Sequence, residues 1–193
     1  MFWTQIEQTP MAQMARAAYL SPDRKYHGMN HIDDMFLYAG MYGVPYDVEL
    51  DKAIWAHDVI LDGLGQHERR SADWLEAVIP GSGKACKMIM TTEEHRLVNG
   101  DNHLVFLDLA GFICEKKRHE NLKLVFDEMK KPDDSFGDID GIYKNILSYL
   151  EGLHDGLVSD LEFRSDINYR EQFEKIVFGI KDIMKTITTL YID

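Results

Sequence analysis

The stretch "AIWAHDVI", residues 53–60, decides the fold. Six of its eight residues are apolar, a composition typical of a segment that packs in a core. His57 and Asp58 nevertheless stand side by side in the middle of it. Burying an ionised carboxylate without a partner is strongly unfavourable. The stretch therefore predicts a core helix in which Asp58 either binds a metal with His57, pairs with a buried arginine, or caps a neighbouring helix.

Length and composition predict one globular domain over residues 1–193. The chain has 45% hydrophobic residues and a formal net charge of −12. That charge repels long polyanions, so duplex DNA or RNA is excluded as an expected partner. No apolar run approaches the roughly 20 residues that span a bilayer, and residues 1–20 lack the pattern of a secretory signal. We expect a cytoplasmic protein with no membrane partner.

Apolar residues recur mostly at helical spacing, which predicts an all-α fold. The expected helices cover residues 3–19, 29–42, 48–60, 67–79, 84–95, 103–117, 119–130, 138–153 and 168–190. The segments "KPDDSFG" (131–137) and "DGLVSD" (155–160) are expected to separate the last three helices.

Polar residues at three expected helix starts are candidate caps. Asp47 is expected to cap the third helix and Ser82 the fifth, while either Asp101 or Asn102 caps the sixth.

The remaining local features concern the two cysteines and the first helix. Cys86 and Cys114 lie in apolar helical contexts and belong to no CxxC pair, so buried free thiols are expected. The first helix is rich in aromatic residues and methionines. These can pack in the core or form a homodimer contact: Phe2, Trp3, Met11 and Met14.

Three further polar positions stand out. His27 and His31 are four residues apart in "YHGMNHI" (26–32) and can share a helix face, although lone histidines are usually structural. Glu68 begins a helix beyond the "LDGLGQ" loop, where it can either reach the site or favour the helix dipole. Asp108 is a second carboxylate inside an apolar run, "FLDLAGF" (106–112).

Two such carboxylates plus histidines, on separate helices, fit a metal site inside a helical bundle. Imidazole and carboxylate ligands suit Mn, Fe, Co, Ni or Zn, and a site richer in carboxylate and water suits Mg.

The order His31, His57-Asp58, Asp108 resembles the H…HD…D signature of the HD-domain superfamily of metal-dependent phosphohydrolases. One branch, made up largely of predicted hydrolases, carries YHNxxHI, WxHD, NExxSA, T-x-x-H and FLDxDLAxLG motifs in this order. The similar segments here are "YHGMNHI" (26–32), "AIWAHDVI" (53–60), "HERRSADWL" (67–75), "TTEEH" (91–95) and "FLDLAGF" (106–112).

The likeness covers about residues 19–112 and departs from the branch pattern in places. Only Asp108 represents the two aspartates of the last motif, and Asp101 is the alternative ligand. Gln66 precedes the E-x-x-S spacing where the branch tends to have Asn before its Glu. Residues 113–193 form a divergent helical part, in which residues 116–137 look like an insertion.

The resemblance implies a single-domain HD-type helical bundle with a central divalent metal ion. It implies His31, His57, Asp58 and Asp108 as metal ligands, with open coordination positions for water and a phosphate oxygen. Mn, Co, Ni, Fe, Zn and Mg all remain candidates.

The same resemblance suggests roles for nearby residues. Glu68 would orient or deprotonate the attacking water, and Asp58 would act in catalysis through the metal. His95 would bind the phosphate or protonate the leaving oxygen. His27 and Arg24 would neutralise a second phosphate oxygen.

The function implied is a metal-dependent phosphohydrolase that releases phosphate from a small phosphorylated substrate, with a nucleotide as the first expectation. One alternative is a regulatory protein that binds metal or nucleotide with little or no turnover. A second is a helical interaction protein whose buried polar residues are structural.

Overall fold

The computed structural model describes residues 3–130 and 139–192. The helices are α1 Pro10–Tyr19, α2 Met29–Met41, α3 Val48–Ala56, α4 His67–Val78, α5 Gly83–Met90, α6 His103–Leu109, α7 Glu115–Met129, α8 Ile139–Phe163 and α9 Arg170–Ile187. A 3-10 turn, Ala110–Phe112, continues α6, and a π-helical turn, Thr188–Ile192, follows α9. No β-strand occurs within the described residues. The prediction of an all-α domain is confirmed.

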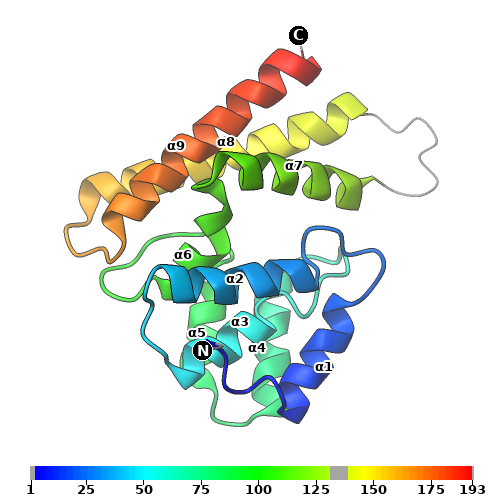
Figure 1. Ribbon diagram of the computed structural model, residues 1–193, viewed down its shortest axis with the longest axis vertical. Helices are drawn as coiled ribbons and strands as arrows, with labels where there is room; N and C mark the ends of the chain where they lie inside the picture. The colour runs from blue at the N-terminus through cyan, green and yellow to red at the C-terminus, as the bar shows by residue number, and fades with distance from the viewer. Residues whose placement is uncertain (1–2, 131–138, 193) are drawn as a thin grey trace.

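The helices form two groups joined by α6 (Figure 1). Helices α1 to α5 pack in the lower group, and the long helices α8 and α9 run antiparallel in the upper one with α7 beside them. One continuous hydrophobic cluster includes residues of both groups. Phe106 of α6 links them, because its ring stacks on Tyr169 at 4.4 Å between centroids and meets Phe173 of α9 edge-on.

A close crossing fixes α9 on the 3-10 turn that follows α6. A Cβ atom at Gly179 would lie 2.1 Å from the carbonyl oxygen of Phe112, far inside contact distance. Glycine is therefore required in this buried helical position, despite its low helix propensity.

The first helix is shorter than predicted. Thr9 caps α1 and Pro10 occupies its first turn, so residues 3–9 form an irregular segment. The Thr4 hydroxyl and the backbone N–H of Gln5 donate to the two carboxylate oxygens of Asp51 at 2.7 and 2.8 Å. The segment is thus held by a buried carboxylate in α3. Met11 packs in the core and Met14 is half exposed, while Phe2 lies outside the described residues.

Three of the middle helices end earlier than predicted. Helix α3 ends at Ala56, so His57 and Asp58 lie in the turn that follows it. Helix α5 ends at Met90, and α6 gives way to the 3-10 turn at Ala110. After α3 and α6, apolar residues continue past the helix end because the turn itself is packed in the core, where Val59 and Ala110 are buried.

The C-terminal helices begin or end elsewhere than predicted. Helix α7 begins at Glu115, and α8 continues through "DGLVSD" to Phe163. This segment is helical because Leu157 and Asp160, three residues apart, both face inward and are buried. The other expected break, residues 131–137, lies outside the described residues.

The predicted caps and thiols are confirmed in part. Asp47 caps α3 by accepting from the N–H of Glu49 at 2.8 Å. Ser82 stands at the start of α5 but makes no side-chain cap bond, because its hydroxyl donates to Ile79. Both cysteines are free, as predicted, but Cys114 is exposed and Cys86 only half buried. Cys114 precedes α7 at a helix boundary that the apolar pattern did not reveal.

At the start of α6, Asn102 occupies the cap position without a side-chain cap bond. Asp101 instead accepts from the N–H of His103 at 3.1 Å.

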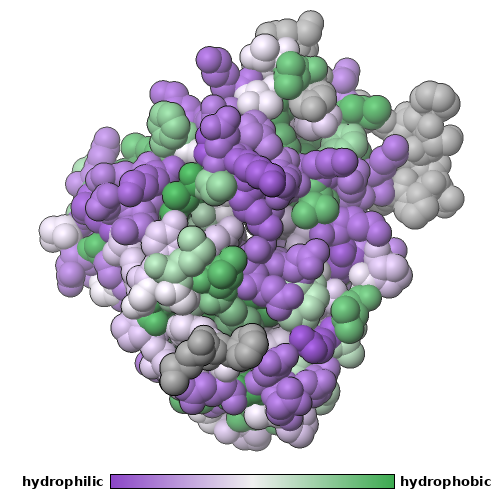
Figure 2. Space-filling view, viewed as in Figure 1, coloured by the Kyte–Doolittle hydropathy of each residue, from purple (hydrophilic) through white to green (hydrophobic). Residues whose placement is uncertain are grey.

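Hydrophilic side chains cover most of the face shown in Figure 2, and apolar side chains gather there in small patches. Among the described residues, no helix has the length and apolar content needed to cross a bilayer.

Candidate metal centre

Three predicted ligands from three different parts of the chain meet at one point. His31 lies in the first turn of α2, His57 directly follows α3, and Asp108 lies in α6. Nε2 of His31 is 3.3 Å from Nε2 of His57 and 3.0 Å from Oδ1 of Asp108. One ligand atom from each residue lies within 4.8 Å of the others, so the three can hold a metal ion together.

His57 is held in the orientation that a metal ligand needs. The side chain is 1% exposed, and Nδ1 lies 3.0 Å from the carbonyl oxygen of Ile54. A carbonyl only accepts, so Nδ1 carries the proton and donates it. When the ring is neutral, the lone pair of Nε2 points into the cluster, as in metal-bound histidines whose other nitrogen is hydrogen-bonded.

Asp58 lies beside the three-residue cluster and outside it. Its Oδ2 is 3.2 Å from Nε2 of His57, yet no oxygen of Asp58 belongs to the compact group. Its backbone is fixed by Tyr19, whose hydroxyl accepts from the Asp58 N–H at 3.2 Å, and by Arg24, which donates to the Asp58 carbonyl at 2.6 Å. The place of Asp58 as a fourth ligand stays a prediction.

Charges in the cluster depend strongly on one another. Burial lowers the pKa of His57, but the neighbouring Asp58 carboxylate outweighs this and raises the pKa to about 9. Burial also raises the pKa of Asp58 and of Asp108, yet adjacent imidazoles hold both pKa values below the usual range. These two carboxylates stay ionised only because positive charge lies beside them.

Asp108 links the cluster to His95. Its Oδ1 faces His31, and its Oδ2 lies 2.9 Å from Nε2 of His95. Nδ1 of His95 lies 3.4 Å from the Tyr149 hydroxyl of α8. His95 has a positive φ of 49°, which ends the turn after α5 and aims the ring at Asp108. In this arrangement His95 orients a metal ligand, and only its Nδ1 faces away from Asp108.

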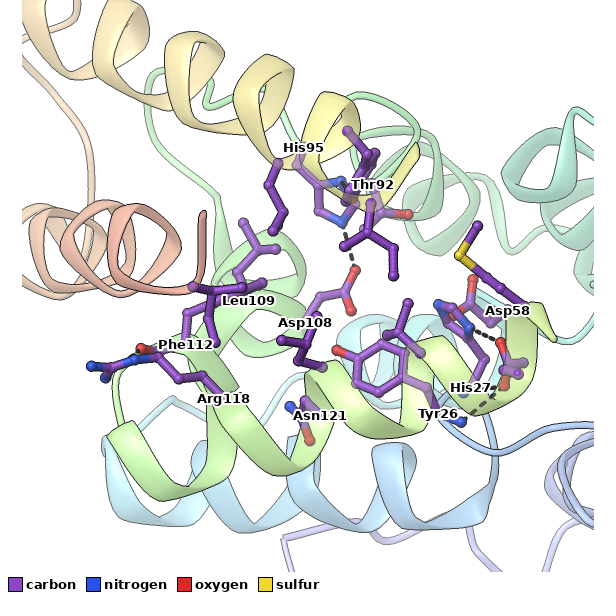
Figure 3. Close-up of a pocket in the computed structure, with 18 of the residues that line it drawn as sticks. Tyr26, His27, Asp58, Thr92, His95, Asp108, Leu109, Phe112, Arg118 and Asn121 are labelled. Atoms are coloured by element: carbon purple, nitrogen blue, oxygen red, sulfur yellow. Dashed lines mark hydrogen bonds and ion pairs between the residues drawn. The ribbon is translucent and has the colours of Figure 1, made fainter. Parts of the chain in front are cut away.

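A cavity of about 440 Å³ opens beside the cluster (Figure 3). Asp58, Glu68, His95 and Asp108 are among its lining residues. Figure 3 shows Asp108 pointing into its centre, between His95 and Tyr26. This volume falls in the range of small-molecule sites, roughly 300–1,000 Å³.

A glycine loop brings Glu68 to this cavity. Gly63 and Gly65 have φ values of 76° and 78°, which residues with side chains rarely adopt. The loop is closed where the N–H of Ile60 donates to Ser71 Oγ at 3.1 Å. The first turn of α4, with Glu68, therefore lines the same cavity as Asp58, as in the first of the two alternatives that the sequence left open.

The two predicted phosphate-binding residues already have partners. Nδ1 of His27 lies 2.5 Å from Oε1 of Glu128, which also raises the pKa of His27 against the effect of burial. Arg24 donates to the carbonyls of Asp58 and Val59 and does not line the cavity. Their roles in phosphate binding stay predictions, and Arg24 would have to leave both carbonyls to reach a ligand there.

The structure brings Asp108, and not Asp101, to the cluster. Asp101 is 44% exposed in its side chain and pairs with His103 at 2.5 Å. The shortened last motif thus still supplies one carboxylate at the meeting point of α2, α3 and α6.

Sequence reasoning missed that α7 forms one wall of the site. Residues 116–137 looked like an insertion, yet Asn121, Val125 and Glu128 line the cavity. Glu128 Oε2 also accepts from the N–H groups of Tyr26 and His27 at 2.9 and 3.0 Å. The helical spacing of apolar residues in "NLKLVFDEM" indicated an inward face, but nothing local indicated what that face would meet.

A divalent ion fits this donor set. Two imidazole nitrogens and one carboxylate oxygen, with Asp58 adjacent, are the ligand types that Mn, Fe, Co, Ni and Zn prefer. The ion would also supply the positive charge that the two carboxylates need.

No protein-family model matches this chain. No curated protein and no solved structure matches it either. The all-helical fold and the His/His/Asp cluster are compatible with the HD type, and the resemblance described above rests on the sequence motifs of residues 19–112.

Proposed function

We propose that this protein is a metal-dependent phosphohydrolase of the HD type. The observation that carries the proposal is the meeting of His31, His57 and Asp108 in one cluster, from which Asp108 reaches the lining of a ligand-sized cavity. These three residues would hold the ion, with Asp58 as the fourth ligand. A bound divalent ion would polarise the phosphorus centre and lower the pKa of a water.

The reaction would replace an ester or anhydride bond of the substrate with a bond to water oxygen. A water oxygen bonds to phosphorus while the bond from phosphorus to the leaving oxygen breaks. Glu68 accepts one proton from the water, and the leaving oxygen gains one proton, so that the products are inorganic phosphate and an alcohol or shorter phosphate. Glu68 suits this role because it lines the cavity from the first turn of α4 and is half buried.

His95 is the candidate proton donor to the leaving oxygen. Its Nε2 is engaged by Asp108, so the donation would come from Nδ1, beside the Tyr149 hydroxyl. His27 would bind a phosphate oxygen if it turned from Glu128. From the resemblance, a nucleotide is the first substrate class to test.

A regulatory metal-binding protein with little turnover is the second candidate. One observation favours it: among the described residues lining the cavity, the sole lysine or arginine is Arg118, and this is paired with Asp182 at 2.8 Å. A phosphate would therefore meet little fixed positive charge besides the ion.

Phosphate release from loaded protein tests the proposal. Purified protein is reloaded with Mn, Co, Ni or Mg and mixed with nucleotides, cyclic nucleotides, sugar phosphates and alkyl phosphates. We expect release that falls at least about a hundredfold in Glu68→Gln and persists in the exposed α4 control Asp73→Asn. Metal-loaded protein that releases no phosphate from any compound would favour the regulatory candidate.

A further inference from the structure

The cavity beside the metal cluster has two chemically different parts. The carboxylates Asp58, Glu68 and Asp108 line one part. In the view of Figure 3, Leu109 and Phe112 lie on the side of Asp108 opposite to Asp58 and His27, with Arg118 and Asn121 near Phe112. The apolar lining from α6, the 3-10 turn, α7, α8 and α9 includes Leu109, Phe112, Leu122, Val125, Ile146 and Ile183.

Most of this apolar lining belongs to helices α7, α8 and α9, which do not carry the residues of the metal cluster. Ile146 of α8 and Ile183 of α9 are 6% and 1% exposed, so they form a fixed floor. Val125 lies on α7, which Glu128 ties to the loop carrying Tyr26 and His27. A ligand whose reacting group sits at the cluster would place the rest of its body against these side chains.

Charge in the cavity limits how many phosphates that ligand can carry. The described lining includes four carboxylates, Asp58, Glu68, Asp108 and Glu128, against the guanidinium of Arg118 and the imidazoles of His27, His67 and His95. Arg118 is paired with Asp182, whose Oδ2 lies 3.0 and 2.8 Å from Nε and Nη2, while His27 and His95 face Glu128 and Asp108. A divalent ion would share its charge with Asp58 and Asp108, so it offsets at most part of a single phosphate group of about two negative charges. It cannot also offset the further charges of a triphosphate in a lining this acidic.

We propose that the substrate is the phosphate monoester of an apolar alcohol, with the phosphate beside Asp58 and Asp108 at the ion that the cluster would hold, and the hydrocarbon body along Leu122, Val125 and Ile146. This assignment rests on the proposed function, and it narrows the substrate from the nucleotide that the sequence resemblance suggested. A nucleoside triphosphate would bring charge that the lining does not match and polar base edges that the apolar floor does not satisfy.

Hydrolysis and binding of an alkyl series test this assignment separately from turnover. Ethyl, butyl, hexyl and octyl phosphate are compared with adenosine mono- and triphosphate in phosphate release by metal-loaded protein. Binding of ethyl- and octylphosphonate, which cannot be hydrolysed, is measured by calorimetry on the same preparation. Each buried methylene should improve kcat/KM or affinity by about fourfold until the cavity is filled.

The expected result is at least about a tenfold preference for octyl over ethyl compounds in both measurements, with the triphosphate poorest. Release that is independent of chain length, or fastest with the triphosphate, would overturn the assignment while leaving the phosphohydrolase proposal intact. Absence of any release would instead defeat the phosphohydrolase proposal. In that event binding of the two phosphonates tests the ligand class. Tighter binding of octylphosphonate than of ethylphosphonate would support an apolar ligand, and equal binding of both, or no binding, would refute it.

Val125→Phe locates the effect in the cavity, because the larger side chain occupies the space that the alkyl chain needs. The octyl-to-ethyl ratio should fall by about tenfold or more, whereas the same change at the exposed start of α3, Val48→Phe, should leave it unchanged. If circular dichroism shows that Val125→Phe is unfolded, Leu122→Asn takes its place with the same expected loss. An unchanged ratio in the folded cavity variant would refute the proposed seat of the chain.

Discussion

Replacing Gly179 with alanine tests whether the crossing of α9 over the 3-10 turn positions the metal cluster. The added Cβ would lie 2.1 Å from the Phe112 carbonyl oxygen and 3.0 Å from its carbon, both of which are backbone atoms. Real Cβ atoms essentially never come within 3.0 Å of such atoms, so α9 or the turn must move by about an ångström. Overpacking of this kind costs about 1–3 kcal/mol, against a gain in helix propensity of about 1 kcal/mol.

Urea denaturation gives the change in the free energy of unfolding, and Gly152→Ala is the matched control. Gly152 is also helical, and a Cβ there meets nothing within 4 Å. We expect Gly152→Ala to stabilise the protein by about 0.5–1 kcal/mol and Gly179→Ala to destabilise it by up to about 2 kcal/mol. The two glycines should thus give opposite signs in one measurement.

The displacement caused by Gly179→Ala should also affect the His31, His57 and Asp108 cluster. Phe112 lines the cavity and follows Asp108 by four residues, so a displaced turn should also weaken metal affinity, by about tenfold in a titration. Equal stabilisation by both alanines, with unchanged metal affinity, would show that the crossing is not tight and does not position Asp108.

Three further predictions concern the cluster and its neighbours. In metal-free protein the pKa of His57, raised to about 9 from 6.5, contributes stability that is fully present below pH 6.5 and is lost as the pH rises through 9, by about 3 kcal/mol in urea denaturation. A His57→Gln variant should lack most of this slope, and an equal slope in both proteins would contradict the assignment. Glu128→Gln should weaken the contact with His27 and destabilise the protein by about 1–3 kcal/mol, and an unchanged urea midpoint would show that α7 is held elsewhere. Asp160→Ala should destabilise by about 1–3 kcal/mol because it leaves the buried N–H of Leu97 without its acceptor and removes the carboxylate that Arg96 binds, and a loss below 1 kcal/mol would refute that role.

The ligands could be predicted from the sequence because each is a residue type that conflicts with its surroundings. His57 and Asp108 interrupt apolar runs, and a buried polar group needs a partner that the run itself does not supply. Their order along the chain resembles the H…HD…D signature, and that resemblance implied that the partners are one another and a cation. The helical periodicity predicted the fold class for a similar reason, since it records which face of each segment is buried.

The rest depends on contacts between distant segments, which no local pattern records. Arg24 lies only three residues before His27 in sequence, but the turn after α3 places two backbone carbonyls within its reach. Glu128 follows His27 by about a hundred residues, so the sequence around either residue does not predict that the two side chains pair. The first helix was predicted too long because Trp3 and Ile6 are apolar at helical spacing. Their burial comes instead from a segment anchored on Asp51.

Metal content is the most direct test of the central claim. Purified protein is dialysed with limiting Mn, Co, Ni and Zn, freed of excess metal, and analysed by elemental mass spectrometry. The structure predicts about one ion per chain, lost in His57→Ala and in Asp108→Ala and retained in Asp101→Ala. Protein that binds no divalent ion, or that keeps its ion in a folded His57→Ala/Asp108→Ala double variant, would contradict the account.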